Sequence, residues 1–238
     1  MITFLLKTLI AHVLGDFVFQ SDQWIKDKQL NKAKSKFLYF HIAIHCIILL
    51  LLFKFNIEFW LAFIVIPMSH YVIDLIKIHL EERINSRYLF SLDQLAHLSV
   101  MLAMSWHYYP QELVFNFHLS DSIYFLALCI LILTYGVAVL IKVIMSKWDL
   151  PEDSDKDSLS KAGKYIGILE RLFVFSFVVM QEWQAIGFLI AAKSVFRFGD
   201  LSRAKDRKLT EYILIGTLLS FGFAILIGFL YEIMVKEI

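Results

Sequence analysis

Apolar stretches about as long as a bilayer is thick recur along the whole chain, and they constrain its fold more than any other feature. A helix needs about 20 mostly apolar residues to cross the hydrocarbon core. Eight stretches approach that length: 2–20, 37–54, 58–78, 90–107, 122–144, 164–180, 183–199 and 210–234. Hydrophobic residues make up 59% of the chain, against about 45–50% in soluble domains. The sequence therefore predicts an all-α, multi-pass bundle of about eight transmembrane helices in a lipid bilayer.

Basic residues are concentrated in every second connector. The connectors after the first, third, fifth and seventh helices carry them: 21–36, 79–89, 145–163 and 200–209. The connectors in between contain almost no Lys or Arg. Because basic loops stay in the cytoplasm, we expect both termini to lie outside a bacterial cytoplasmic (inner) membrane. The net charge of +1 and the lack of a basic tail give no indication of a nucleic-acid partner.

The segment 149–163 divides the chain into two halves. It is acidic, rich in serine and interrupted by Pro151, a composition typical of a solvated linker. The first half, 1–148, contains helices one to five and all eight histidines. The second half, 164–238, contains helices six to eight and has Lys, Arg and Glu within its apolar stretches.

Ionisable side chains recur in pairs inside the first four predicted spans. Each pair is spaced i, i+4, which places both side chains on one helix face. The pairs are His12 with Asp16, His41 with His45, His70 with Asp74, and Asp93 with His97. Since the helices alternate in direction, all four pairs are expected at one depth, just below the cytoplasmic surface. An up-down four-helix cluster would point them at a common centre.

Eight imidazoles and carboxylates at one level predict a metal site, because ionisable residues within a membrane are costly and are commonly functional. His and Asp donors without Cys favour zinc, with manganese and iron as alternatives. More than four ligands would allow two ions, which together polarise a phosphoryl group. Asp16, Asp74 and Asp93 are then the candidate catalytic carboxylates. The alternative is a set of hydrogen-bonded polar side chains that only hold the helices together.

A second set of polar residues lies in the later helices and beside the pairs. Lys193 and Arg197 close the seventh helix at i, i+4, and Arg171 lies inside the short sixth span. With Gln20 and Lys77 next to the His/Asp pairs, these are candidate substrate-binding groups, because a phosphate needs cationic partners. Glu170 and Glu211 are expected to be structural partners of the basic residues.

Several segments resemble a bacterial and phage membrane-protein family known only as a domain of unknown function. They are AHVLGDFVFQSDQW, HYVID and DQLAH in the first half, and KYIGILERLF, AAKSVFRFGDL and TEYILIGTLLSFG in the second. The segment HVLGDFVFQ is also similar to the H-x-x-G-D-x-x-Q signature of the zinc-dependent phospholipase C and single-strand nuclease superfamily. Membrane-bound metal-dependent hydrolases use similar helices.

This second resemblance implies that His12, Asp16, His70 and Asp74 bind zinc in a site that cleaves phosphoesters. The chain departs from the signature in two respects. Gln20 follows Asp16 by four residues instead of three, and the Pro-x-His that follows in that superfamily is missing.

The preferred function is a metal-dependent hydrolase acting on a phospholipid-like or other phosphoester at the cytoplasmic face. A di-iron lipid oxidase is an alternative because His41 and His45 resemble one histidine box of membrane desaturases, although no H-x-x-H-H box occurs. Two further alternatives are a divalent-cation or proton-coupled transporter and a non-catalytic membrane assembly protein.

Overall fold

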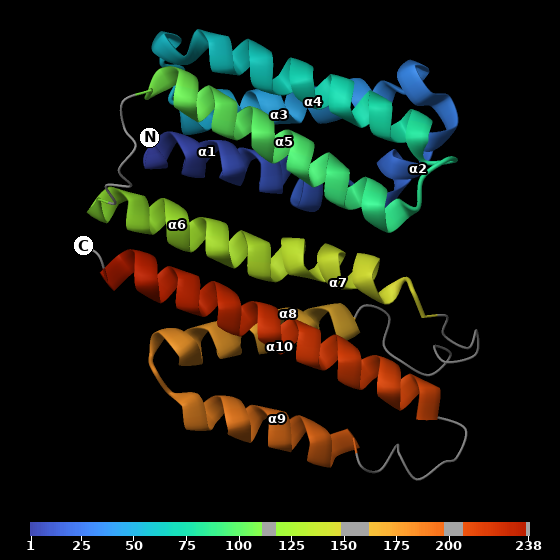
Figure 1. Ribbon diagram of the computed structural model, residues 1–238, viewed down its shortest axis with the longest axis vertical. Coiled ribbons are helices and arrows are strands. Elements are labelled where there is room, and N and C mark those ends of the chain that lie inside the picture. The colour runs from blue at the N-terminus through green and yellow to red at the C-terminus, as the bar shows by residue number, and fades with distance from the viewer. Residues whose placement is uncertain (111–117, 149–161, 198–206, 237–238) are drawn as a thin grey trace. The chain divides into compact units, whose positions relative to one another are not determined.

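The fold is built from helices that follow the predicted apolar stretches. The computed structural model describes residues 1–110, 118–148, 162–197 and 207–236 (Figure 1), and no strand occurs among them. The helices are α1 (Ile2–Val13), α2 (Asp22–Asn31), α3 (Lys36–Leu52), α4 (Trp60–Leu80), α5 (Ser86–Tyr108), α6 (Leu119–Leu131), α7 (Val137–Met145), α8 (Ala162–Val179), α9 (Trp183–Arg197) and α10 (Arg207–Lys236). The prediction of an all-α fold is confirmed.

Shorter helical segments join or extend several of these helices. The π-helix η1 (Leu14–Phe19) continues α1, and the π-helix η4 (Ile132–Gly136) joins α6 to α7. The 3-10 segments η2 (Lys32–Lys34) and η3 (Ile57–Phe59) precede α3 and α4. With these junctions, each predicted apolar stretch is one helix within the described residues. The chain also forms a ninth, α2, in the connector where no helix was predicted.

The chain forms two compact units, Met1–Leu131 and Ile132–Ile238. The first contains all four His/Asp pairs, and the second contains the later Lys, Arg and Glu residues. Residues 149–161 of the predicted linker lie outside the described part of the chain.

Four described helices are long and apolar enough to cross a membrane: Ile2–Phe19, Ile57–Leu80, Asp121–Met145 and Thr210–Val235. A fifth arises if Asp22–Lys34 and Lys36–Leu52, which meet at 106°, are counted as one broken span. Fewer helices thus qualify than the eight predicted. α3 and α9 have only 17 and 15 residues, while polar residues lower the apolar character of α5 and α8. These long apolar helices are those of a membrane protein, and an eight-span topology remains a prediction.

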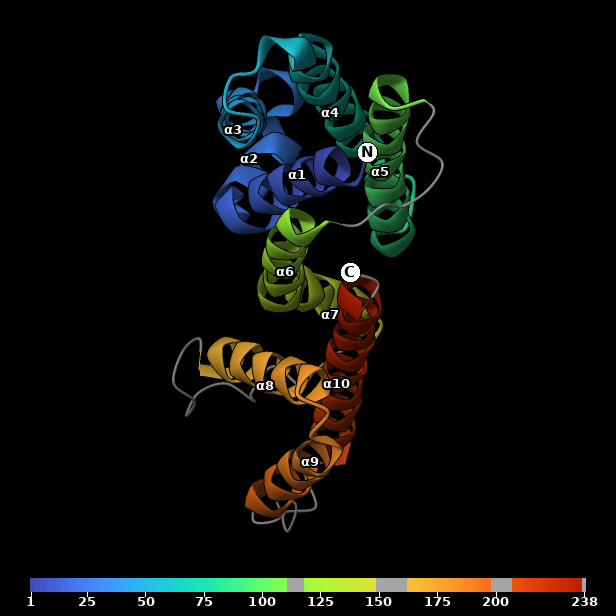
Figure 2. The same ribbon diagram turned by 90° about the vertical axis from the view of Figure 1, so that its left-hand side faces the viewer.

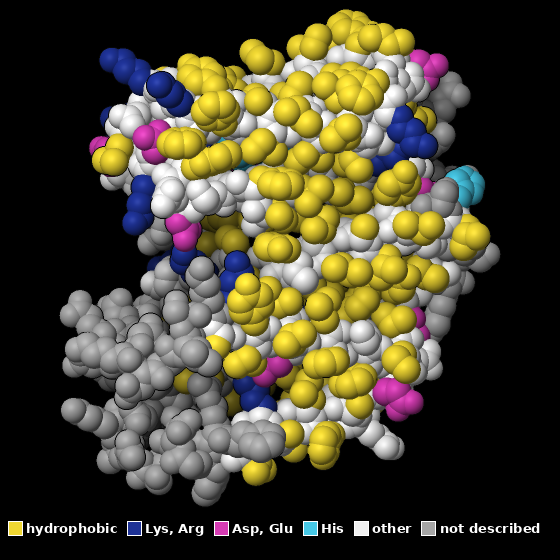
Figure 3. All heavy atoms as spheres, turned by 180° about the vertical axis from the view of Figure 1, so that it is seen from behind, with side chains coloured by type: hydrophobic (Ala, Val, Ile, Leu, Met, Phe, Trp, Pro, Cys, Tyr) yellow, Lys and Arg dark blue, Asp and Glu magenta, His cyan; other side chains and the backbone are white. Residues whose placement is uncertain are grey.

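The helices of the first unit are apolar on the outside and polar on the inside. On α4, the exposed stripe is Trp60, Ile64, Met68, Val72 and Ile76, spaced by four residues. The opposite stripe of the same helix contains the buried His70 and Asp74. On the face seen in Figure 3, hydrophobic side chains are spread across the described helices. A soluble protein would show the reverse arrangement, so these outer faces suit lipid.

Four helices of the first unit form a closed ring around the polar residues. α1 contacts α3 and α5, and α4 contacts the same two helices; the end-on view shows the four grouped together (Figure 2). At one end an apolar core seals the ring, with Phe4 packed against Phe53 at 5.1 Å between ring centres. The short helix α2 crosses the other end (Figure 1). The predicted up-down cluster is therefore present, with the polar layer between the aromatic core and α2.

Candidate metal centre

The π-helix η1 aims the first carboxylate into the ring. α1 is regular as far as Val13, and η1 then carries Gly15 and Asp16. Single π turns within α-helices are rare and occur often at functional sites. A Cβ atom added to Gly15 would lie 2.2 Å from His45 Nε2. Only glycine at this position lets the His45 ring approach the backbone and reach Asp16.

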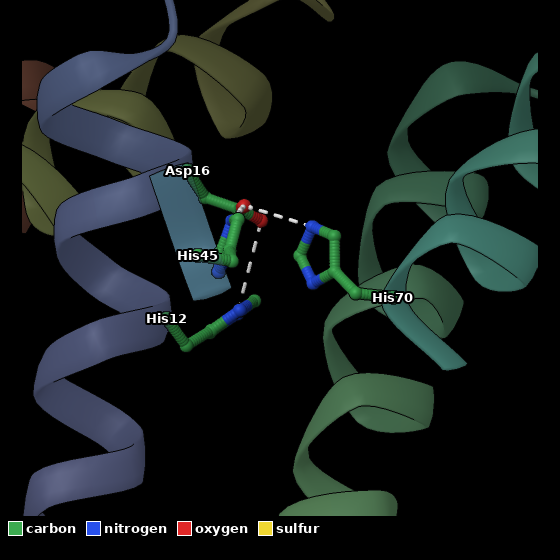
Figure 4. Close-up of side chains that lie close together, drawn as sticks. All are labelled: His12, Asp16, His45 and His70. Carbon is green, nitrogen blue, oxygen red and sulfur yellow. Dashed lines mark hydrogen bonds and ion pairs between the residues drawn. The ribbon is translucent and has the colours of Figure 1, made fainter. Parts of the chain in front are cut away.

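Asp16 lies at the centre of a group of imidazoles (Figure 4). Its Oδ1 atom is 3.0 Å from His45 Nε2 and 3.3 Å from both His41 Nε2 and His70 Nε2. Its Oδ2 atom lies 3.8 Å from His12 Nε2. These five residues come from η1, α3, α4 and α1. Three helices and the π turn thus converge on one carboxylate.

Asp74 continues the cluster on the far side of His41 and His70. Its Oδ2 atom lies 3.6 Å from His41 Nε2, and its Oδ1 atom lies 4.0 Å from both His70 Nε2 and His97 Nε2. The Nε2 atoms of His41 and His70 are themselves 3.0 Å apart. Asp74 is 6% exposed, so it shares the interior with the imidazoles rather than with water.

The third carboxylate, Asp93, shares α5 with His97. His97 Nε2 lies 3.4 Å from Asp93 Oδ1, yet neither atom makes a hydrogen bond within the described residues, and both are buried. Buried polar atoms almost always have a partner. These two buried atoms, 3.4 Å apart and without a hydrogen bond, could share a bound cation as their common partner.

The donor atoms fall into three overlapping groups, within each of which all ligand atoms are no more than 4.8 Å apart. The groups are His12, Asp16, His45 and His70; His41, His70 and Asp74; and Asp74, Asp93 and His97. His70 and Asp74 each belong to two groups. All eight residues predicted from the spacing therefore converge.

Hydrogen bonds alone account poorly for this arrangement. Asp16 Oδ1 has three Nε2 atoms within 3.3 Å, but a carboxylate oxygen has only two lone pairs. The Nε2 atoms of His41 and His70 lie 3.0 Å apart, so one donates to the other and only one carries the proton. The nitrogen without the proton then faces Asp16 Oδ1 at 3.3 Å with a lone pair on each atom. A divalent cation among them removes the conflict, because neutral imidazoles and carboxylates all direct lone pairs towards it.

Two lysines bind the outer carboxylates. Lys28 Nζ of α2 lies 2.8 Å from Asp74 Oδ2, and Lys77 Nζ of α4 lies 2.8 Å from Asp93 Oδ2. Lys77 was predicted beside the site, whereas Lys28 lies in the basic connector 21–36 and was not predicted to belong to it. The sequence indicates the burial of Lys28 only weakly. Lys28 follows Trp24 by four residues and therefore lies on the same face of α2. Lys28 is 4% exposed, so it belongs to the site and not to the surface.

The remaining residues near the cluster have varied roles. Gln94 joins the site, because its Oε1 atom lies 3.2 Å from His12 Nε2 and its amide donates to Asp93. Gln20 is half-buried directly after η1, and its role in substrate binding remains a prediction. The other three histidines, His79, His107 and His118, are exposed and lie outside the cluster.

A small cavity adjoins the imidazoles on the side of the aromatic core. It has a volume of about 10 Å³, and His12, His45, His70 and His97 form one wall of it. That is roughly the space one water molecule requires. Mostly apolar side chains, among them Leu49, line the rest, together with Thr8 and Ser69. The cavity leaves room for a small group beside the donor atoms.

The polar residues of the second unit make contacts within that unit. The guanidinium of Arg171 donates to the backbone carbonyls of Leu133 and Thr134 and to Ser220 Oγ. Its acceptors include carbonyls of η4, where π geometry disturbs the regular helical hydrogen bonds. Arg171 is 4% exposed and thus stabilises the π turn from inside the unit.

The other basic residues give mixed outcomes. Lys193 pairs with Glu170 at 2.7 Å, as the structural role predicted for Glu170 requires. Arg197 ends α9, and its side chain lies outside the described residues. Glu211 lies on α10 and has an interaction partner. Binding of a substrate by Arg171, Lys193 or Arg197 remains a prediction.

Comparison with known proteins gives one match. The model of a family described as "Protein of unknown function (DUF3307)" matches residues 4–126. The matched segment includes all eight donor residues, both lysines and Gln94. No curated protein and no solved structure matches the chain.

Proposed function

The chain belongs to the DUF3307 family of proteins of unknown function, and we propose that it is a membrane-embedded, metal-dependent hydrolase of phosphoesters. The observation that carries the proposal is the overlap of three donor groups within one helical ring. Asp74 is common to two of them, and a carboxylate has two oxygens with which to bridge neighbouring ions. Two adjacent divalent ions are the arrangement that many phosphoesterases use.

The donor set favours zinc, with manganese and iron as alternatives. Five imidazoles and three carboxylates supply nitrogen and oxygen ligands without sulfur, which suits these ions and not copper(I). The likeness of the segment from His12 to Gln20 to the zinc phosphoesterase signature points the same way. Gln94 adjoins the set: its Oε1 atom lies 3.2 Å from His12 Nε2, and its amide donates to Asp93.

The reaction proposed is hydrolysis of a phosphoester bond. Bound divalent ions would supply Lewis-acid activation of a phosphoryl oxygen and of water. A water oxygen bonds to phosphorus, the ester P–O bond breaks, and the departing alkoxide takes up a proton. Asp16, Asp74 and Asp93 hold the cations, and the lysines beside them offer positive charge to the substrate. By the distribution of basic connectors, the site faces the cytoplasmic side of the inner membrane and both termini lie outside.

A second function is favoured by one observation. Imidazoles outnumber carboxylates five to three in the cluster, and a histidine-rich set on membrane helices is also the ligand type of di-iron lipid oxidases. Metal identity separates the two functions. Zinc or manganese bound to the purified protein supports hydrolysis, whereas iron with oxygen-dependent turnover of lipid supports oxidation.

The test is metal-dependent hydrolysis by full-length protein purified in detergent. Bis(p-nitrophenyl) phosphate and a short-chain phospholipid in mixed micelles serve as substrates, with zinc, manganese or no metal added. The substitution Asp74→Asn should remove both metal and activity. Asp22→Asn is the matched control, because Asp22 is an exposed carboxylate on α2. Full metal content without hydrolysis of either substrate would reject the hydrolase and leave the oxidase or a transporter.

A further inference from the structure

Lys28 is held inside the polar ring by contacts along α2. Ser21 caps the helix by accepting a hydrogen bond from the backbone of Trp24, and the Trp24 ring stacks on Phe37 with 5.4 Å between ring centres. Near the other end of α2, Gln29 donates to Glu81, which directly follows α4. These contacts tie α2 to α3 and α4. The placement of Lys28 is therefore built into the fold.

The role of basic connectors in membrane topology does not explain why Lys28 is buried. A lysine in a connector can remain exposed to solvent, as Lys26 on the same helix does. A buried ammonium is costly to desolvate and persists only with a charged partner. The partner of Lys28 is Asp74, the carboxylate shared by two of the donor groups. Lys28 thus lies where a cation bound to Asp74 would compete with it.

The charge of the cluster changes sign when divalent ions bind. Asp16, Asp74 and Asp93 face two ammonium groups, so the net charge is minus one while the imidazoles are neutral. Two divalent ions would make it plus three. An excess of positive charge in a buried site is unfavourable unless an anion accompanies it. A phosphate group carries one or two negative charges and accepts hydrogen bonds from ammonium groups.

The two lysines differ in exposure: Lys77 lies nearer the solvent, and Lys28 lies deeper in the site. The side chain of Lys77 is 29% exposed, whereas that of Lys28 is 5% exposed. We propose that Lys77 and Lys28 together bind the phosphate oxyanion of the substrate once divalent ions hold Asp74 and Asp93. This proposal rests on the metal-dependent function above and identifies its anion-binding residues. It places them in the first unit, on the same helices as the donors or directly beside them.

The experiment measures phosphate binding to zinc-loaded, full-length protein in detergent. One arm uses radiolabelled inorganic phosphate in equilibrium dialysis, and the other uses short-chain phosphatidic acid in mixed micelles. Lys28→Ala should keep the zinc content of the wild type and bind phosphate about 10- to 100-fold more weakly. Lys26→Ala, on the exposed side of α2, should bind both metal and phosphate as the wild type does. The arm with the tighter wild-type binding shows whether the anion is free phosphate or a lipid headgroup.

The remaining outcomes are decisive as well. If Lys28→Ala fails to fold, Lys28→Arg keeps the positive charge and should retain phosphate binding. Unchanged phosphate affinity in a zinc-loaded Lys28→Ala protein would overturn this inference alone. The inference would also be overturned if zinc-loaded wild-type protein bound neither phosphate nor phosphatidic acid. Wild-type protein that takes up no divalent metal would instead overturn the proposed function from which the inference starts.

Discussion

Replacing Gly15 with alanine should disrupt the proposed metal centre, because the added methyl group displaces the His45 ring. The new Cβ atom would lie 2.2 Å from His45 Nε2, while ordinary contact begins at 3.4 Å, so the ring must move by about 1.2 Å. Overpacking of this kind costs about 1–3 kcal/mol of folding stability. The same shift separates His45 from Asp16, now 3.0 Å apart. Loss of an oriented ligand should lower metal affinity about 10- to 100-fold or more.

Two other glycines provide controls for this prediction. Gly136 also lies in a π turn, but its added Cβ atom would meet only Ile132, at 3.6 Å. Gly136→Ala should therefore be neutral or stabilise the helix by up to about 1 kcal/mol. Gly228→Ala would bring a Cβ atom 2.7 Å from Val178, so it should lower stability without changing metal content. Thermal unfolding and elemental analysis of the three variants measure both effects. A Gly15→Ala protein with wild-type metal affinity would refute the reasoning.

Further predictions concern ligands, packing and topology. Asp16→Asn should reduce the bound metal by at least about tenfold, because an amide oxygen replaces the charge that four imidazoles surround; equal metal content by elemental analysis would contradict this. Arg171→Leu should lower the free energy of unfolding by about 1–3 kcal/mol, since the carbonyls of Leu133 and Thr134 lose their donor; an unchanged unfolding temperature would argue against that role. Chelation should lower the unfolding temperature, given that a ligand at 100 times its Kd stabilises by about 2.7 kcal/mol; a protein insensitive to chelator would lack a structural metal. In a background without Cys46 and Cys129, a cysteine at position 26 should react with a thiol reagent only from the cytoplasmic side; labelling from outside would reverse the topology.

The helices and the convergence of the His/Asp pairs could be predicted because both depend on local periodicity. Spacing of i, i+4 fixes a face, and alternating helix direction fixes a depth, so His12 and Asp74 were expected near each other without knowledge of the packing. The π turn at Gly15 could not be predicted in this way. It depends on the His45 ring contacting the backbone of another helix, and no local pattern encodes such a contact.

The role of Lys28 was missed for a related reason. α2 is polar and rich in lysine, a composition that also describes a solvated connector, and only tertiary packing separates the buried Lys28 from the exposed Lys26. The eight spans predicted from the apolar stretches exceed the four or five described helices that are long and apolar enough to cross a membrane. α5 is a full helix of 23 residues, but its buried Asp93 and His97 reduce the apolar character by which a span is recognised.

Metal stoichiometry tests the central claim most directly. Full-length protein is purified in detergent, loaded with zinc, freed of unbound metal and examined by elemental analysis. Three donor groups that share His70 and Asp74 predict about two ions per chain, and fewer than half as many in an Asp74→Asn protein. Protein that remains free of metal after loading, with Asp16 merely hydrogen-bonded to its imidazoles, would contradict the account.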